Sequence, residues 1–153
     1  MATIRTYLVD ANEKAGNRTF VRWKSRGEWH SWSFSELYTR TRIVAEAANK
    51  LEVKPDFRVA LMMENRPEWL VTYLGLVTVG IEVVPIDARL QEKEVSYILR
   101  DSGAYAVFAS GKLWPLLSSI AQDLPELKHL VVLDGAVAIE AKEGHVIAHD
   151  YVA

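Results

Sequence analysis

The sequence predicts an α/β fold: a doubly wound parallel sheet of about four strands with flanking helices and an N-terminal β-hairpin. From residue 58 onward, short apolar runs alternate with segments of helical spacing, which indicates parallel strands joined by helical crossovers. Before that, residues 19–33 alternate with period two on either side of a short turn, which is typical of a hairpin. Half of the chain is hydrophobic and a quarter is charged, so it can build a packed core.

The hairpin and a helix come first along the chain. Residues 18–24 alternate in side-chain type, Ser25-Arg26-Gly27 is a turn signal, and residues 28–33 form the predicted returning strand. A capping box follows, in which Ser33 caps the helix and Glu36 reaches back to the backbone. The helix continues with apolar side chains at helical spacing until Lys54-Pro55 ends it.

The parallel core is predicted in the second part of the chain. Strands are expected at 58–63, 82–86, 105–109 and 130–133, with helices at 67–79, 92–101 and 112–124 between them. The helix that begins at Pro67 is apolar on most of its faces, so it should be buried on more than one side. We divide the single subdomain 1–153 into a lead-in (1–18), the hairpin (19–33), the α/β core (34–134) and a tail that is irregular or partly β (135–153).

Composition excludes several classes of function. A formal charge of −2 gives no electrostatic reason to expect nucleic acid or an anionic membrane as a partner. The chain has no cysteine, which excludes disulfides and thiolate metal sites. Its longest uncharged stretch, residues 69–81, is too short for a transmembrane segment. We therefore expect a soluble, cytoplasmic protein.

Three motifs are weaker than they first look. Ser110-Gly111-Lys112 resembles the end of a phosphate-binding loop, but Ala106 and Leu113 stand where that loop needs glycine and a hydroxyl residue. His145 and His149 would lie too far apart on one strand to share a metal ion. The basic and aromatic side chains of residues 22–32 are typical of proteins that bind single-stranded nucleic acid. A half-buried hairpin needs the same alternation, and we favour the hairpin interpretation.

Polar residues follow each predicted strand, at the end where open α/β sheets bind ligands. They are Glu64-Asn65, Asp87-Ala88-Arg89, Ser110-Gly111-Lys112 and Asp134. No nucleophile stands beside a base in this set. The residues by themselves predict a parallel α/β domain with a ligand-binding edge, and no catalytic or metal-binding residue.

Four segments then carry a resemblance to a known family. Residues 32–37 (WSFSEL), 64–69 (ENRPEW), 80–87 (GIEVVPID) and 94–104 (EVSYILRDSGA) resemble consecutive motifs of the adenylate-forming enzymes, in the same order. The second segment is similar to the long-chain fatty-acid–CoA ligase branch. The resemblance extends over about residues 19–152, so the chain looks like the N-terminal region of an AMP-forming acyl-CoA synthetase.

The resemblance implies a two-step ligase that uses ATP, Mg²⁺ and coenzyme A on a carboxylic acid, expected to be a fatty acid. The family's phosphate loop and C-terminal lysine have no counterpart in these 153 residues. We therefore expect a fragment of the larger adenylate-forming domain that is inactive alone and binds none of these cofactors tightly. The resemblance also places Arg89 and Lys112 near the nucleotide end of coenzyme A in the full enzyme.

One alternative of another class stays open, a non-catalytic flavodoxin-like domain that serves binding or oligomerisation. A phosphate-accepting receiver of that shape would need an acid after its third strand, where Phe108-Ala109-Ser110 offers none. In either case we expect a homo-oligomer. The helix beginning at Pro67 is apolar on most of its faces, and packing against the chain's own sheet would cover only one of them.

Overall fold

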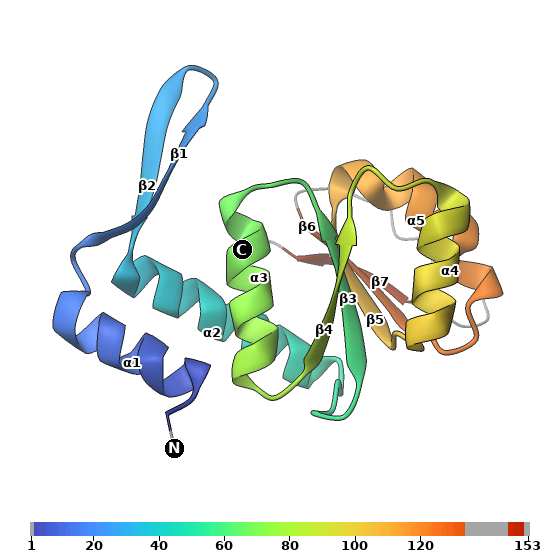
Figure 1. Ribbon diagram of the computed structural model, residues 1–153, viewed down its shortest axis with the longest axis horizontal. Coiled ribbons are helices and arrows are strands. Elements are labelled where there is room, and N and C mark those ends of the chain that lie inside the picture. Colours follow the sequence, from blue (N-terminus) through green and yellow to red (C-terminus); the bar gives the residue numbers. More distant parts are fainter. Residues whose placement is uncertain (1, 134–146, 152–153) are drawn as a thin grey trace.

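The described residues contain a parallel sheet of five strands, which helices surround (Figure 1). The computed structural model describes residues 2–133 and 147–151. The strands lie in the order β4-β3-β5-β6-β7. Their bounds are β3 (Arg58–Met63), β4 (Glu82–Asp87), β5 (Ala106–Ser110), β6 (His129–Leu133) and β7 (Ile147–Tyr151).

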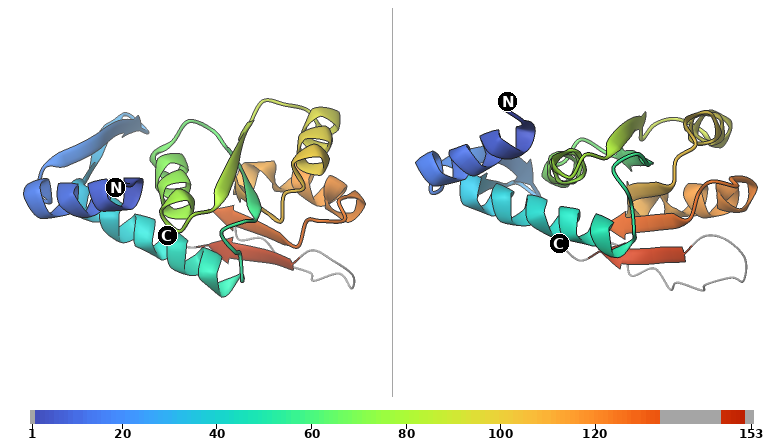
Figure 2. Two further views of the ribbon diagram at one scale, coloured as in Figure 1. Left: turned by 60° about the horizontal axis from the view of Figure 1, so that its bottom comes forward. Right: turned by 90° about the horizontal axis from the view of Figure 1, so that it is seen from below.

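Helices connect the strands and cover both faces of the sheet (Figure 2). The α-helices are α1 (Ile4–Ala15), α2 (Phe34–Lys50), α3 (Pro67–Thr78), α4 (Glu92–Ser102) and α5 (Trp114–Ile120), and the 3₁₀ turns η1 (Gly111–Leu113) and η2 (Ala121–Asp123) flank α5. The first three α-helices lie on one side of the sheet, and α4 and α5 lie on the other. The predicted doubly wound parallel sheet is thus confirmed.

The strand order reverses between β3 and β5. After β3 the chain adds β4 on one side through α3, and then returns past β3 to add β5 on the opposite side. Counted from β3, this is the 2-1-3-4-5 order of flavodoxin-like sheets, whose ligands lie beyond the carboxyl ends of the strands at the point of reversal. The fold therefore directs attention to the residues that follow β3 and β5.

Side chains of the central strand alternate between two cores. Val59 and Leu61 face the side of α2 and α3, whereas Ala60 and Met62 face the side of α4 and α5, and all four are fully buried. This alternation is the consequence of the two-residue period of a strand that is covered on both faces. A strand buried on both faces also reads as a continuous apolar run, which is why residues 58–63 were recognisable.

The hairpin projects away from the sheet (Figure 1). Its strands β1 (Thr19–Ser25) and β2 (Glu28–Ser33) are joined by Arg26 and Gly27, both with positive φ, the two-residue turn that matches strand twist. On one face Trp23 stacks on His30 and packs edge-on against the buried Trp32, with ring centroids 5.6 and 4.9 Å apart. The half-buried face agrees with the prediction that these aromatic side chains pack within the hairpin.

The predicted capping box at the start of α2 is present. The Glu36 backbone N–H donates to Ser33 Oγ at 3.2 Å, and the Ser33 N–H donates to the Glu36 carboxylate at 2.7 Å. These two bonds satisfy donors that the first turn of a helix leaves free. They also lower the pKa of Glu36.

Two elements were not predicted as such. Residues 1–18 contain α1, which begins at a reciprocal Thr3–Thr6 cap and is tied to α2 by a 2.8 Å hydrogen bond between Asn12 and Ser35. The tail contributes β7, which pairs in parallel with β6. His149 lies in β7, while His145 lies outside the described residues. In the described ranges, no group of three or more His, Asp or Glu could hold a metal ion.

The helix that begins at Pro67 is covered on two sides by elements of this chain. Packing against α2 buries Gly75, and Leu76 belongs to the core between α3 and the sheet. Leu70, Tyr73 and Val77 remain half-buried. Within residues 2–133 and 147–151, no helix is both long and apolar enough to cross a membrane.

Candidate functional site

The carboxyl ends of β3, β4 and β5 bring charged residues to one edge of the sheet, which we call the carboxyl edge. The strands are parallel and in register, with Met63 beside Asp87 and Met62 beside Ala109. Residues that directly follow these positions therefore emerge at the same level. Glu64 follows β3, Arg89 follows β4, and Lys112 lies in η1 after β5.

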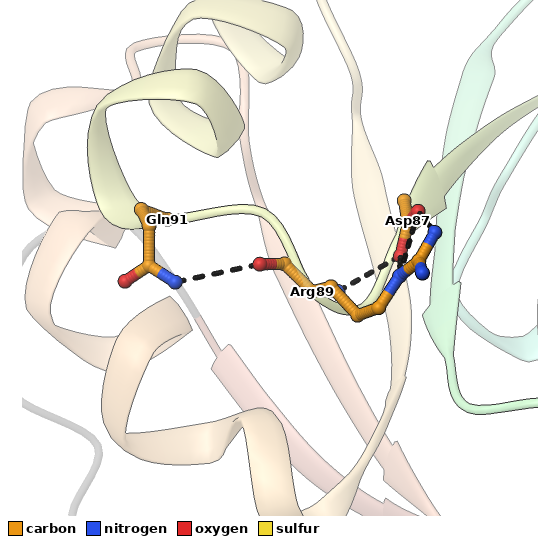
Figure 3. Close-up of polar contacts among 3 residues, drawn as sticks. All are labelled: Asp87, Arg89 and Gln91. Atoms are coloured by element: carbon orange, nitrogen blue, oxygen red, sulfur yellow. Dashed lines mark hydrogen bonds and ion pairs between the residues drawn. The ribbon is translucent and has the colours of Figure 1, made fainter.

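Arg89 is held by Asp87, the last residue of β4 (Figure 3). Arg89 Nη2 donates to Asp87 Oδ2 at 2.6 Å, and Arg89 Nε lies 3.0 and 3.2 Å from the two carboxylate oxygens. The Arg89 backbone N–H also donates to Asp87 Oδ1, at 2.9 Å. The carboxylate thus grips both the side chain and the main chain of Arg89, a fork geometry that lysine could not reproduce.

This grip controls the charge of Asp87. The hydrogen bonds from the Arg89 side chain and backbone lower the pKa of Asp87 to about 2. The same contacts raise the pKa of Arg89. Asp87 is therefore ionised throughout the neutral and mildly acidic range. On the other side of the loop, Gln91 donates from its side-chain amide to the Arg89 carbonyl oxygen at 3.4 Å (Figure 3).

Lys112 has a looser partner at the neighbouring strand end. Its Nζ lies 3.7 Å from Glu64 Oε1, and the lysine side chain is 82% exposed whereas that of Glu64 is 37% exposed. Burial by itself would raise the pKa of Glu64, but its own backbone N–H, the nearby Ser110 hydroxyl and the charges of Lys112 and Arg66 together lower it. Glu64 therefore stays ionised at neutral pH, and Lys112 is an exposed positive charge beside it.

Ser110 is the buried member of this group. It ends β5 and is 2% exposed, and its hydroxyl lies close enough to Glu64 to affect the carboxylate without making a hydrogen bond among the described residues. A buried hydroxyl without a partner costs free energy, about 1–3 kcal/mol in typical cases. The Ser110 hydroxyl is therefore a buried polar group whose hydrogen-bonding capacity is unsatisfied among the described residues.

The structure places Arg89 and Lys112 on the same edge without bringing them together. β3 lies between β4 and β5, so the strands that carry the two cations are about 10 Å apart. Two spaced cations and two carboxylates can hold a charged ligand, but they supply no nucleophile activated by a base. Sequence reasoning found the cations and placed Glu64 and Asp87 in the same rim, but it did not pair them.

A groove of about 300 Å³ lies elsewhere, between α1, α2 and the C-terminal end of α3. Its lining includes Leu8, Thr41 and Val79, with Arg5 and Glu46 among its charged residues. None of the residues at the carboxyl edge lines it. The groove is thus separate from the candidate site.

Comparison with known proteins identifies the family. A family model described as AMP-binding enzyme matches residues 8–150. Crotonobetaine/carnitine–CoA ligase of Escherichia coli is 31% identical over 143 residues, which cover 92% of this chain and 27% of that protein.

Two solved structures agree with that match. The anthranilate CoA ligase AuaEII in complex with anthranoyl-AMP is 27% identical with a TM-score of 0.76, over 86% of this chain and 25% of that one. A benzoate CoA ligase of Burkholderia xenovorans LB400 is 28% identical with a TM-score of 0.74, over 86% and 26%. This chain spans about a quarter of the length of these relatives. It belongs to the family of AMP-binding enzymes.

Proposed function

We propose that residues 1–153 form the N-terminal part of an ATP-dependent carboxylic acid–CoA ligase. In such an enzyme the substrate carboxylate attacks the α-phosphorus of ATP, which releases pyrophosphate and forms an acyl-adenylate. The thiolate of coenzyme A then attacks the acyl carbon, and AMP leaves. The observation that carries the proposal is the family match over residues 8–150, together with relatives whose names state a CoA ligase activity.

The residues of this chain are proposed to serve the second substrate. Lys112 and Arg89 lie at the carboxyl edge near the point where the strand order reverses, the usual ligand position in such sheets. Their charges suit the phosphates at the nucleotide end of coenzyme A. Mg²⁺, bound together with ATP, would neutralise developing phosphate charge. We assign no residue of this chain to the metal or to the adenylation step.

The acid is proposed to be a fatty acid, from the resemblance of residues 64–69 to the fatty-acyl branch. The relatives reported above carry other acids in their names. A panel of octanoate, palmitate, benzoate, anthranilate and crotonobetaine, assayed with the enzyme that carries this chain, decides the matter. Faster turnover of the two unbranched acids supports the proposal, and preference for any of the other three refutes it.

The role of Lys112 can be tested in that enzyme by the Lys112→Ala substitution. We expect the apparent KM for coenzyme A to rise severalfold while ATP–pyrophosphate exchange with the acid stays unchanged, because Lys112 acts only on the second substrate. Lys93→Ala is a matched control, since Lys93 is an exposed lysine on α4 with no ion pair among the described contacts. If the KM for coenzyme A is the same in Lys112→Ala and Lys93→Ala, Lys112 does not contribute to the coenzyme A site.

We further propose that the chain by itself is catalytically inactive, because the family's phosphate loop and C-terminal lysine have no counterpart in these 153 residues. A homo-oligomer is proposed from the half-buried apolar side chains on α3, among them Leu70 and Val77. The absence of cysteine fits a cytoplasmic location, which we also propose.

A further inference from the structure

Each cation at the carboxyl edge already has an anionic partner from the end of a neighbouring or preceding strand. Asp87 binds Arg89 through three side-chain contacts of 2.6–3.2 Å. Glu64 lies 3.7 Å from Lys112. The two pairs together carry no net charge, so this edge is not a preformed cationic trap.

We propose that Asp87 and Glu64 are positioning residues that hold Arg89 and Lys112 in neutral pairs, so that a phosphate binds here by replacing a carboxylate. The inference rests on the proposed function, since it takes a phosphate of coenzyme A as the ligand. Each carboxylate opposes the approach of a phosphate and competes with it for the same cation. Their removal therefore strengthens phosphate binding.

The two pairs differ in how readily they open. Both cationic side chains are largely exposed, so their contacts decide: Lys112 has one contact of 3.7 Å, and its ammonium can turn to a ligand at little cost. Arg89 would have to give up a bidentate pair with Asp87, whose carboxylate the Arg89 backbone N–H also holds in place. A phosphate thus binds Lys112 first, and it binds Arg89 only after the ion pair between Arg89 and Asp87 has broken.

The carboxylates on this edge also set which charges are available over the working range of pH. Both carboxyls have lowered pKa values, so neither releases its cation by protonation near neutral pH. Arg66 is the further charged group that acts on Glu64. Ligand binding, and not a change of pH, is therefore what opens the pairs.

The test is a titration of the 153-residue chain with adenosine 3′,5′-bisphosphate, followed by the ¹⁵N signals of Lys112 Nζ and Arg89 Nε at low salt. We expect Glu64→Gln to tighten binding about two- to fivefold and Asp87→Asn to tighten it by at least as much. Lys112→Gln should weaken it severalfold. In the double variant Asp87→Asn/Arg89→Gln the gain from Asp87→Asn should disappear, because Arg89 is the cation that Asp87 withholds.

Glu82→Gln is the matched control. Glu82 lies at the opposite end of β4 and pairs with Arg58 at 3.0 Å, so its removal changes the net charge equally but leaves the carboxyl edge intact. We expect wild-type affinity. Thermal melting of every variant shows whether it is folded.

The outcomes separate the inference from the proposed function. If Lys112→Gln weakens binding but Glu64→Gln and Asp87→Asn bind as the wild type does, the cofactor site stands and the inference is wrong. If Glu82→Gln tightens binding as much as the other two, net charge is the cause and the inference is again wrong. If the bisphosphate shifts the Lys112 and Arg89 signals neither in the wild type nor in any variant that keeps these residues, the site assignment fails and the inference fails with it.

Discussion

Gly75 in α3 lies so close to Val44 in α2 that no side chain fits between them. A Cβ atom placed on Gly75 would stand 2.5 Å from Val44 Cβ and 2.9 Å from the Thr41 carbonyl oxygen. Real carbon atoms do not approach so closely, so the two helices cross at backbone distance only because position 75 is glycine. This contact fixes α3, whose first turn directly follows the loop that carries Glu64.

Replacement of Gly75 by alanine should therefore destabilise the chain, although alanine is the better helix former. We expect a loss of about 1–3 kcal/mol in the free energy of unfolding, the usual cost of overpacking a core. Urea unfolding followed by tryptophan fluorescence measures it. The double variant Gly75→Ala/Val44→Ala should show less than the sum of the two single losses; strict additivity would mean that the two residues are not in strained contact.

Asp87 should titrate far below an ordinary aspartate. Its folded-state pKa of about 2 lies below the ordinary value of 3.8, so its pair with Arg89 contributes to stability above the ordinary value, and the contribution is lost as pH falls through about 2. A ¹³C titration of the side-chain carboxyl should show that midpoint. Arg89→Gln should return the midpoint toward 3.8. A midpoint near 3.8 in the wild type would show that the pair does not form in solution.

The isolated chain should show no ATP–pyrophosphate exchange with any carboxylic acid. Adenylation needs groups that hold the triphosphate and stabilise the charge that develops on it, and we assign none of them to these residues. The measurement is incorporation of labelled pyrophosphate into ATP, with heat-killed protein as the control. Exchange above that control would contradict the proposal that the chain is inactive alone.

The isolated chain should also associate. Half-buried Leu70, Tyr73 and Val77 on α3 leave apolar surface that a second copy can cover. Light scattering during size-exclusion chromatography at micromolar concentration should report at least twice the mass of one chain. Leu70→Lys should shift the population toward monomer, whereas Lys93→Ala should not; a monomeric wild type that binds no hydrophobic dye would contradict the expectation.

The sequence predicted the parts of the fold whose signals are local. The apolar run of residues 58–63, the Ser33–Glu36 capping box and the turn at Arg26-Gly27 each follow from neighbouring residues, and each was found. The helix α1 was missed because it has no fully buried residue, and because Thr6 stands where a capping box usually has Glu or Gln. The tail was predicted to be partly β, but the bounds of β7 were not predicted, because the tail carries no clear period.

The candidate site divides in the same way. Asp87 and Arg89 are two positions apart, so their contact is a local property that the Asp-Ala-Arg sequence could have indicated. Glu64 and Lys112 meet only because β3 and β5 are neighbours. The hydrophobic pattern predicts where strands occur along the chain, but not their order in the sheet. Without the order of the strands, the sequence cannot show which strand ends are neighbours.

The insertion of β5 beside β3 links ligand occupancy to local unfolding. β3, α3 and β4 are consecutive and can form one unit, but the pair of Glu64 and Lys112 exists only while β5 is docked on the other side of β3. A ligand that bridges Lys112, after β5, and Arg89, after β4, needs β5 docked beside β3, so it stabilises β5 against opening by mass action. Amide hydrogen exchange in β5 therefore slows as this edge fills, in proportion to occupancy and without any change in the contacts of the strand itself.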